Sequence, residues 1–126
     1  MKQRVSSGSP LEPVIGFSRA IRTGKQIMVA GTAPIEPDGS TTPGDAAAQM
    51  ERCCAIIAKA IVDLGGSISD MVRTCIYLTD RADFLGVAAV HGRWFGDARP
   101  ATTTLIVSGF VDPDWRVEIE AETMEV

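Results

Sequence analysis

The sequence lacks the features that mark disulfide-stapled, secreted and membrane-spanning proteins. Only three of its 126 residues are cysteines, and none stands in a C-x-x-C pair, which excludes a disulfide scaffold and favours a reducing compartment. No apolar run approaches the roughly 20 residues that span a bilayer, and residues 1–10 are polar, without the apolar core of a signal peptide. We therefore expect a cytoplasmic protein with no membrane partner.

Positive charge is also scarce. Twelve Lys and Arg residues stand against 16 Asp and Glu residues, for a net charge of −4. Nucleic-acid binders usually carry a basic surplus or stripe, whereas the arginines here are scattered, so we expect no nucleic-acid partner. Cys53 and Cys54 would diverge by about 100° on a helix and cannot easily hold one metal ion. Both are predicted to be core residues, and Cys75 an interface or core residue.

What the sequence does contain is an ordinary globular composition, with 45% hydrophobic and 22% charged residues. Its length fits one domain over residues 1–126. Hydrophobic periodicity predicts the order β-β-α-β-α-β-β, after a loose lead-in over residues 1–13 and with a loop over 34–44. The predicted strands cover 14–22, 26–30, 71–78, 102–107 and 116–124, and the predicted helices cover 45–64 and 81–95.

This order indicates an α+β fold in which two helices pack on one face of a single sheet. Asp45 or Thr42 can cap the first helix, and Gly65 can end it. The second helix is predicted to place Phe84, Val87, His91 and either Trp94 or Phe95 on one side. Small and apolar residues on the other face of the sheet predict self-association. The strand over 71–78 should set Cys75 opposite a face formed by Val72, Thr74, Ile76 and Leu78.

Seven segments, in order and over nearly the whole chain, resemble the motifs of the RidA/YjgF family of reactive-intermediate deaminases. The resemblance implies a chorismate-mutase-like fold and a homotrimer with a small-molecule ligand in each of three clefts between subunits. The segments are I-G-F-S-R-A (15–20), V-A-G-T-A-P (29–34), A-Q (48–49), D-M-V-R-T (70–74), D-F (83–84), R-P-A-T (99–102) and V-E-I-E-A (117–121).

The resemblance also implies an activity. Family members hydrolyse reactive enamines and imines, such as 2-aminoacrylate, 2-iminopropanoate and 2-iminobutanoate, without a cofactor or a metal. A glutamate that handles the attacking water aligns with Glu118, the candidate catalytic residue here. An arginine that holds the substrate carboxylate through two parallel hydrogen bonds is replaced by Thr102.

Other cleft positions also carry less polar side chains than the family has there, so the cleft as a whole should be less polar. Since losing a charged hydrogen-bond partner costs roughly 1.5–3 kcal/mol, 2-aminoacrylate should be a poor substrate. A larger or uncharged ligand is expected. Phe17 stands for a tyrosine, Ala30 for a serine, Ala88 for an asparagine and Thr104 for a cysteine, and His91 stands where many relatives have a tyrosine.

Several of these residues admit two interpretations. Arg19 is predicted to share the cleft with Phe17, because strand residues two apart point the same way. It then supplies the missing charge or, alternatively, pairs with a surface or interface carboxylate. Glu118 is a general base if burial raises its pKa, or one of a solvated row of acids. Gly31 either donates a hydrogen bond from its N–H to a ligand or simply forms a tight turn.

His91 and the threonines are equally open. His91 lies on the apolar side of a helix, where a lone histidine is more often packed than catalytic. The hydroxyls of Thr102 and Thr104 can bind a ligand oxygen, although the threonine run also fits plain β-propensity. The hypotheses for function are an imine hydrolase, a trimer that binds a small metabolite without turnover and, ranked last because of the acidic charge, a ribonuclease or translation inhibitor.

Overall fold

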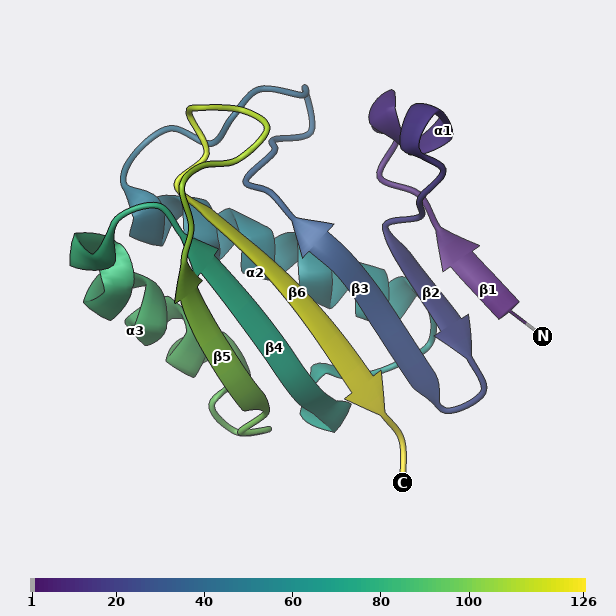
Figure 1. Cartoon of the computed structure of the whole chain (residues 1–126). Helices are drawn as coiled ribbons and strands as arrows, with labels where there is room; N and C mark the ends of the chain where they lie inside the picture. The colour runs from purple at the N-terminus through teal and green to yellow at the C-terminus, as the bar shows by residue number, and fades with distance from the viewer. Residues whose placement is uncertain (1) are drawn as a thin grey trace.

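The computed structural model describes residues 2–126, and its centre is a six-stranded mixed sheet with the strand order β1-β2-β3-β6-β4-β5. Only β4 and β5 pair in parallel. The helices α2 and α3 cover one face of the sheet and leave the other open, while the short α1 lies beyond the end of β1 (Figure 1). The predicted α+β fold is therefore confirmed. The strands are β1 (Lys2–Val5), β2 (Ala20–Thr23), β3 (Gln26–Thr32), β4 (Met71–Leu78), β5 (Ala101–Ile106) and β6 (Val117–Met124), and the helices are α1 (Leu11–Ile15), α2 (Ala46–Asp63) and α3 (Phe84–Phe95).

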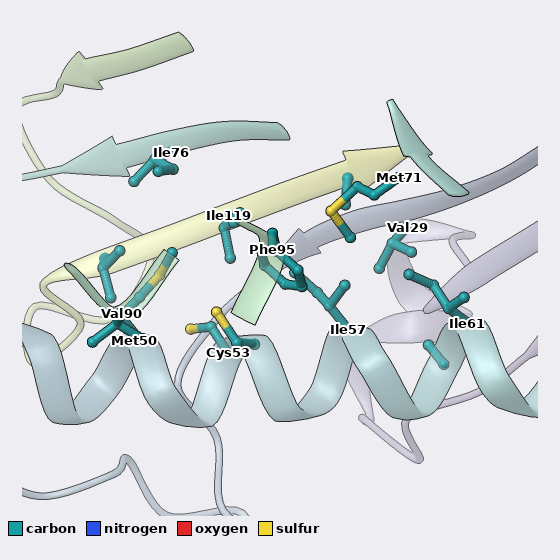
Figure 2. Packing of buried hydrophobic residues seen from close by; sticks show 14 of the residues in the cluster. Val29, Met50, Cys53, Ile57, Ile61, Met71, Ile76, Val90, Phe95 and Ile119 are labelled. Carbon is teal, nitrogen blue, oxygen red and sulfur yellow. The ribbon is translucent and has the colours of Figure 1, made fainter. Parts of the chain in front are cut away.

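The first long helix, α2, begins and ends where its sequence provides the signals. Asp45 is the N-cap, because its carboxylate accepts the Ala48 N–H at 2.9 Å. The other predicted cap, Thr42, bonds Glu36 instead, at 3.1 Å. Gly65 has a φ of +77°, which ends the helix. The helix buries an apolar stripe against the sheet (Figure 2), formed by Met50, Cys53, Cys54, Ile57 and Ile61.

Alternate side chains of β6 point to the two opposite faces of the sheet. Its buried residues Val117, Ile119 and Ala121 face the helices, so Glu118 and its neighbours in the acidic row project from the open face. Cys75 lies on the open face as predicted, opposite Glu120. Val72 does not lie in the core. A register shift between Met71 and Arg73 lets Met71 take the buried place, and Val72 is 44% exposed.

The structure differs from the sequence prediction over residues 1–22. The expected lead-in contains β1 and α1, and the expected strand over 14–22 is reduced to β2. The reason is a side-chain cap: the Glu12 carboxylate accepts the N–H groups of Ser7 and Ser9 at 2.8 and 3.3 Å, which winds the segment into a turn. Gly16, at a φ of +85°, then ends α1.

The second predicted helix also begins differently. Residues 81–83 form a separate 3-10 turn, and α3 starts at Phe84. Phe84, predicted on the same side of the helix as Val87, is 44% exposed and lies outside the core. Asp80 caps the 3-10 turn by accepting the Ala82 N–H at 2.9 Å, and this sets the turn apart from the α-helix. The buried face of α3 is formed by Val87, Val90 and Phe95.

A buried amide positions the loop that leads into β6. Gln49 is 3% exposed. Its Nε2 donates to the carbonyl of Asp114 at 3.0 Å, and its Oε1 accepts the Arg116 N–H at 2.8 Å. Gln49 therefore fastens the start of β6, and with it Glu118, to the first turn of α2.

Replacing Gln49 with leucine is expected to lower the free energy of unfolding by about 2–3 kcal/mol. The change leaves two backbone groups of the loop without partners, each at a cost of about 1–3 kcal/mol where water cannot reach it. Urea titration of both proteins measures the difference. Gln49→Glu keeps the acceptor but sets a buried carboxylate against the Asp114 carbonyl, so it should lose at least as much; wild-type stability in Gln49→Leu would contradict this role for Gln49.

Candidate functional site

The predicted site residues form two separate groups within one chain. The first, called here the Glu118 group, consists of Phe17, Arg19, Gly31 and Glu118 around the ends of β3 and β6. The second, the His91 group, consists of Ala88 and His91 on α3 and Thr102 and Thr104 on β5, together with Thr74 on β4. Thr102 is in register with Thr74, whose side chain contacts α3, so Thr102 lies on the helix side of the sheet. Glu118 lies on the open side.

An irregularity in β3 brings the first group together. The pairing of β3 with β6 shifts register between Val29 and Thr32, which is a bulge. Gly31 lies in this bulge, and a side-chain carbon built on it would lie 3.8 Å from Glu118 Oε1. The backbone of β3 therefore runs directly beside the carboxylate.

Arg19 points into the same region. Its Nη2 donates to the Gly31 carbonyl at 2.6 Å, and its Cζ lies 6.0 Å from the centroid of the Phe17 ring, at the limit of a cation–π contact. Among residues 2–126, no carboxylate lies within 4.0 Å of Arg19. Burial lowers the pKa of Arg19, and Glu12 and Glu118 raise it in turn. Phe17 and Arg19 share one region, although they precede β2 and the strand alternation used to predict this does not apply to them.

The carboxylate of Glu118 is half-buried and has no hydrogen-bond donor among residues 2–126. Burial raises its pKa above the ordinary value, and the positive charge of Arg19 partly offsets the rise. The acidic row is not uniform, because Glu120 accepts a hydrogen bond from the Tyr77 hydroxyl. A carboxylate with a raised pKa and unused acceptor capacity is suited to take a proton from water.

The His91 group is organised around a buried hydroxyl. Thr74 is fully buried, and its Oγ1 lies 2.8 Å from His91 Nε2 and 2.7 Å from Thr102 Oγ1. The Thr102 hydroxyl donates to the Pro100 carbonyl at 3.0 Å. The His91 ring packs edge-on against Phe95, with ring centroids 5.3 Å apart. These contacts hold His91 and Thr102 in one arrangement.

Thr74 was predicted to share one face of its strand with Val72, Ile76 and Leu78, and no role in the site was predicted for it. The available signal was a hydroxyl in the middle of an otherwise apolar row, because a buried polar group must find a partner. Thr104 faces the helix side in register with Ile76, and Ala88 lies one turn before His91 on α3. Neither Ala88 nor Thr104 forms a side-chain hydrogen bond within residues 2–126.

Replacing Thr74 with valine is expected to destabilise the protein by about 1–3 kcal/mol, because the His91 Nε2 and Thr102 Oγ1 atoms then lose their shared partner. Thermal unfolding measures this loss. Thr103→Val is the matched control: Thr103 is on the neighbouring strand but points to the opposite face, opposite Cys75, so its loss should stay within about 0.5 kcal/mol. Similar losses in both variants would contradict a special role for Thr74.

The open face of the sheet is hollowed next to the Glu118 group. The hollow has a volume of about 540 Å³, and its lining includes Arg4, Ser18, Met28, Ala30, Cys75 and Glu120.

Within residues 2–126, no helix is long and apolar enough to cross a membrane, and no three His, Cys, Asp or Glu side chains form a cluster able to hold a metal ion. The three cysteines are buried and unpaired.

Comparison with known proteins gives consistent results. The sequence profile of the family described as Endoribonuclease L-PSP matches residues 8–124. An uncharacterised protein of Streptomyces coelicolor is 36% identical over 120 residues, covering 95% of this chain and 90% of that protein. The 3-aminoacrylate deaminase RutC of Acinetobacter baylyi is 31% identical over 113 residues, covering 89% and 88%. The crystal structure of Rv2704 from Mycobacterium tuberculosis, of the YjgF/YER057c/UK114 family, superposes with a TM-score of 0.89 at 38% identity and covers 99% of this chain and 100% of that one.

Proposed function

The chain belongs to the Endoribonuclease L-PSP family, the YjgF/RidA group, and on that premise we propose that it is a cofactor-free hydrolase of enamine or imine intermediates. The observation that carries the proposal is Glu118, a half-buried carboxylate with a raised pKa and no donor within the described chain. A relative that shares 31% of its residues carries the name 3-aminoacrylate deaminase. That name supports deamination as the reaction class.

In the proposed reaction, Glu118 acts first as a base and then as an acid. Its carboxylate takes a proton from a water molecule while the water oxygen bonds to the imine carbon. The C=N electron pair moves to nitrogen, and the Glu118 carboxyl group passes the proton to this nitrogen, which gives a neutral carbinolamine. Glu118 then takes the proton of the adduct hydroxyl and transfers it to the nitrogen as the C–N bond breaks and the C=O bond forms. Ammonia and a carbonyl compound leave. Arg19, nearby and positively charged, favours the ionised form of Glu118 between cycles.

We propose that the complete site forms between copies of the chain. The Glu118 group and the His91 group lie on opposite faces of one sheet, so one chain cannot bring them to the same ligand. A closed ring of three copies, as the family resemblance implies, sets the Glu118 group of one copy against the His91 group of the next. The hollow in the open face beside Glu118 leaves a surface on which a second copy of the chain can pack, which supports this arrangement. Free, buried cysteines fit the proposed reducing, cytoplasmic setting.

A second candidate is a trimer that binds a metabolite without converting it. The neutral Thr102, where the family has a charged arginine, favours this reading. Ribonuclease activity ranks below both, because the net charge is −4 and phosphate binding needs positive charge.

A coupled assay separates the two leading candidates. Imines are generated from a panel of amino acids by an amino acid oxidase and from the matching amino acid amides through their N-chloro compounds, so that the panel includes imines without a carboxylate. Ammonia release is followed with and without the purified protein. A hydrolase accelerates release for at least one imine of the panel. Rates equal to the uncatalysed reaction across the panel would reject the hydrolase and leave the binding trimer.

A further inference from the structure

The hydrogen bonds of the His91 group fix where each proton lies. Thr102 has one hydroxyl hydrogen, and it is donated to the Pro100 carbonyl. The contact between the two threonine hydroxyls therefore uses the hydrogen of Thr74. Because Thr74 then has no hydrogen left, its contact with His91 requires a hydrogen on Nε2.

This assignment fixes the tautomer of the neutral imidazole. A neutral histidine with a hydrogen on Nε2 has a lone pair on Nδ1. No atom of residues 2–126 forms a hydrogen bond with Nδ1, and Thr74 is fully buried, so no solvent or ligand group can replace its contacts. The edge contact with Phe95, at an interplanar angle of 77°, further holds the ring.

Within the group, the pair formed by His91 and Thr102 therefore displays acceptors and no donors; the Thr104 hydroxyl, two residues further along β5, is not part of this pair. His91 Nδ1 offers one lone pair, and the exposed Thr102 Oγ1, which already accepts from Thr74, offers its second. A carboxylate placed between His91 and Thr102 meets two lone pairs and finds no hydrogen on either side chain. A primary amide or a hydroxyl supplies the hydrogens that these atoms lack.

We propose that Thr74, acting through His91, makes this half of the site select ligands with an uncharged hydrogen-bond donor, such as a primary amide, over ligands with a carboxylate. The proposal rests on the proposed function for the position of the half-site in the cleft, and it deepens that function by naming the substrate class. Thr74 is a positioning residue, because it touches His91 and Thr102 and not the ligand.

Pyruvamide and pyruvate are the probes, because they have the same carbon skeleton and neither is an imine. Titration calorimetry at pH 8 measures both affinities; burial lowers the pKa of His91, so its imidazole is neutral there. Pyruvamide is expected to bind at least about tenfold more tightly, since unpaired polar groups cost about 1–3 kcal/mol. Tighter binding of pyruvate, or no binding of either probe at millimolar concentration, would overturn the proposal.

Two variants at Thr74 test the mechanism of selection. Thr74→Val frees His91 to place its hydrogen on Nδ1, so the preference for pyruvamide should fall to within about twofold of none. Thr74→Ser keeps the hydroxyl and should keep the preference. Nitrogen NMR of the His91 ring should show an unprotonated Nδ1 in the wild type and the serine variant only. An unchanged preference in Thr74→Val would contradict the role of Thr74.

These titrations, combined with measurements of imine hydrolysis, separate this proposal from the proposed function. Absence of imine hydrolysis with a retained preference for pyruvamide would reject the hydrolase and keep the selection rule. Hydrolysis that favours the imine of alanine over the imine of alaninamide would keep the hydrolase and reject the rule. Both imines form by base-promoted loss of HCl from the N-chloro compounds.

Discussion

Replacing Glu118 with glutamine is expected to reduce the rate of imine hydrolysis by about 10²–10⁴-fold, which is the usual contribution of a positioned general base. Glutamine has nearly the same shape but cannot take a proton from water. The coupled assay measures the loss. Glu122→Gln changes an acid of the same row on the same strand and should hydrolyse imines at the wild-type rate. Equal rates in wild type and Glu118→Gln would contradict the mechanism.

The same variant should be more stable than the wild type at neutral pH. Burial raises the pKa of Glu118 in the folded state above its unfolded value, so the ionised side chain opposes folding at pH 7. Below the ordinary glutamate pKa of about 4.3 the group is protonated in both states and the penalty disappears. The gain in Glu118→Gln, under about 1 kcal/mol because the group is half-exposed, should therefore vanish as the pH falls. The activity of the wild type should fall over the same pH range.

Replacing Ala88 with tryptophan is expected to reduce imine hydrolysis at least about 100-fold, although Glu118 is untouched. Ala88 is partly buried and lies one turn from His91, so an indole there fills the space beside the His91 group. Loss of this size means that the substrate is no longer held in an attack geometry. The coupled assay measures the rate, and circular dichroism checks the fold.

The adjacent residue provides a matched control for Ala88→Trp. Ala89 is exposed and points about 100° away around the helix. Ala89→Trp should keep the wild-type rate. Full activity in Ala88→Trp would show that the His91 group takes no part in the site.

The fold could be predicted wherever local signals decide it. The bounds of β4 match the prediction, and α2 matches it to one residue at each end, because caps, glycines and apolar periodicity lie within these segments. The N-terminal region could not be predicted, because its turn depends on one carboxylate, that of Glu12, and β1 depends on pairing with β2. Val14 and Ile15 look like strand residues but are 79% and 67% exposed.

Candidate site residues could be named from the sequence, but their arrangement could not be predicted. The family resemblance and strand alternation point to Glu118, and the structure sets Phe17, Arg19 and Gly31 around it. The division into two groups depends on the parallel register of β5 with β4, which pairs Thr102 with Thr74 and turns it to the helix side. No local pattern encodes that register. The bulge at Gly31 is likewise a property of the pairing between β3 and β6.

The proposed site needs the Glu118 group of one copy of the chain and the His91 group of another. Mixing inactive Glu118→Gln and Ala88→Trp chains, by refolding them together in equal amounts, tests it directly. Random assembly of a closed trimer gives about one site in four with both groups intact, so about a quarter of the wild-type rate should return. A mixture no more active than its two separate components would contradict a site shared between copies.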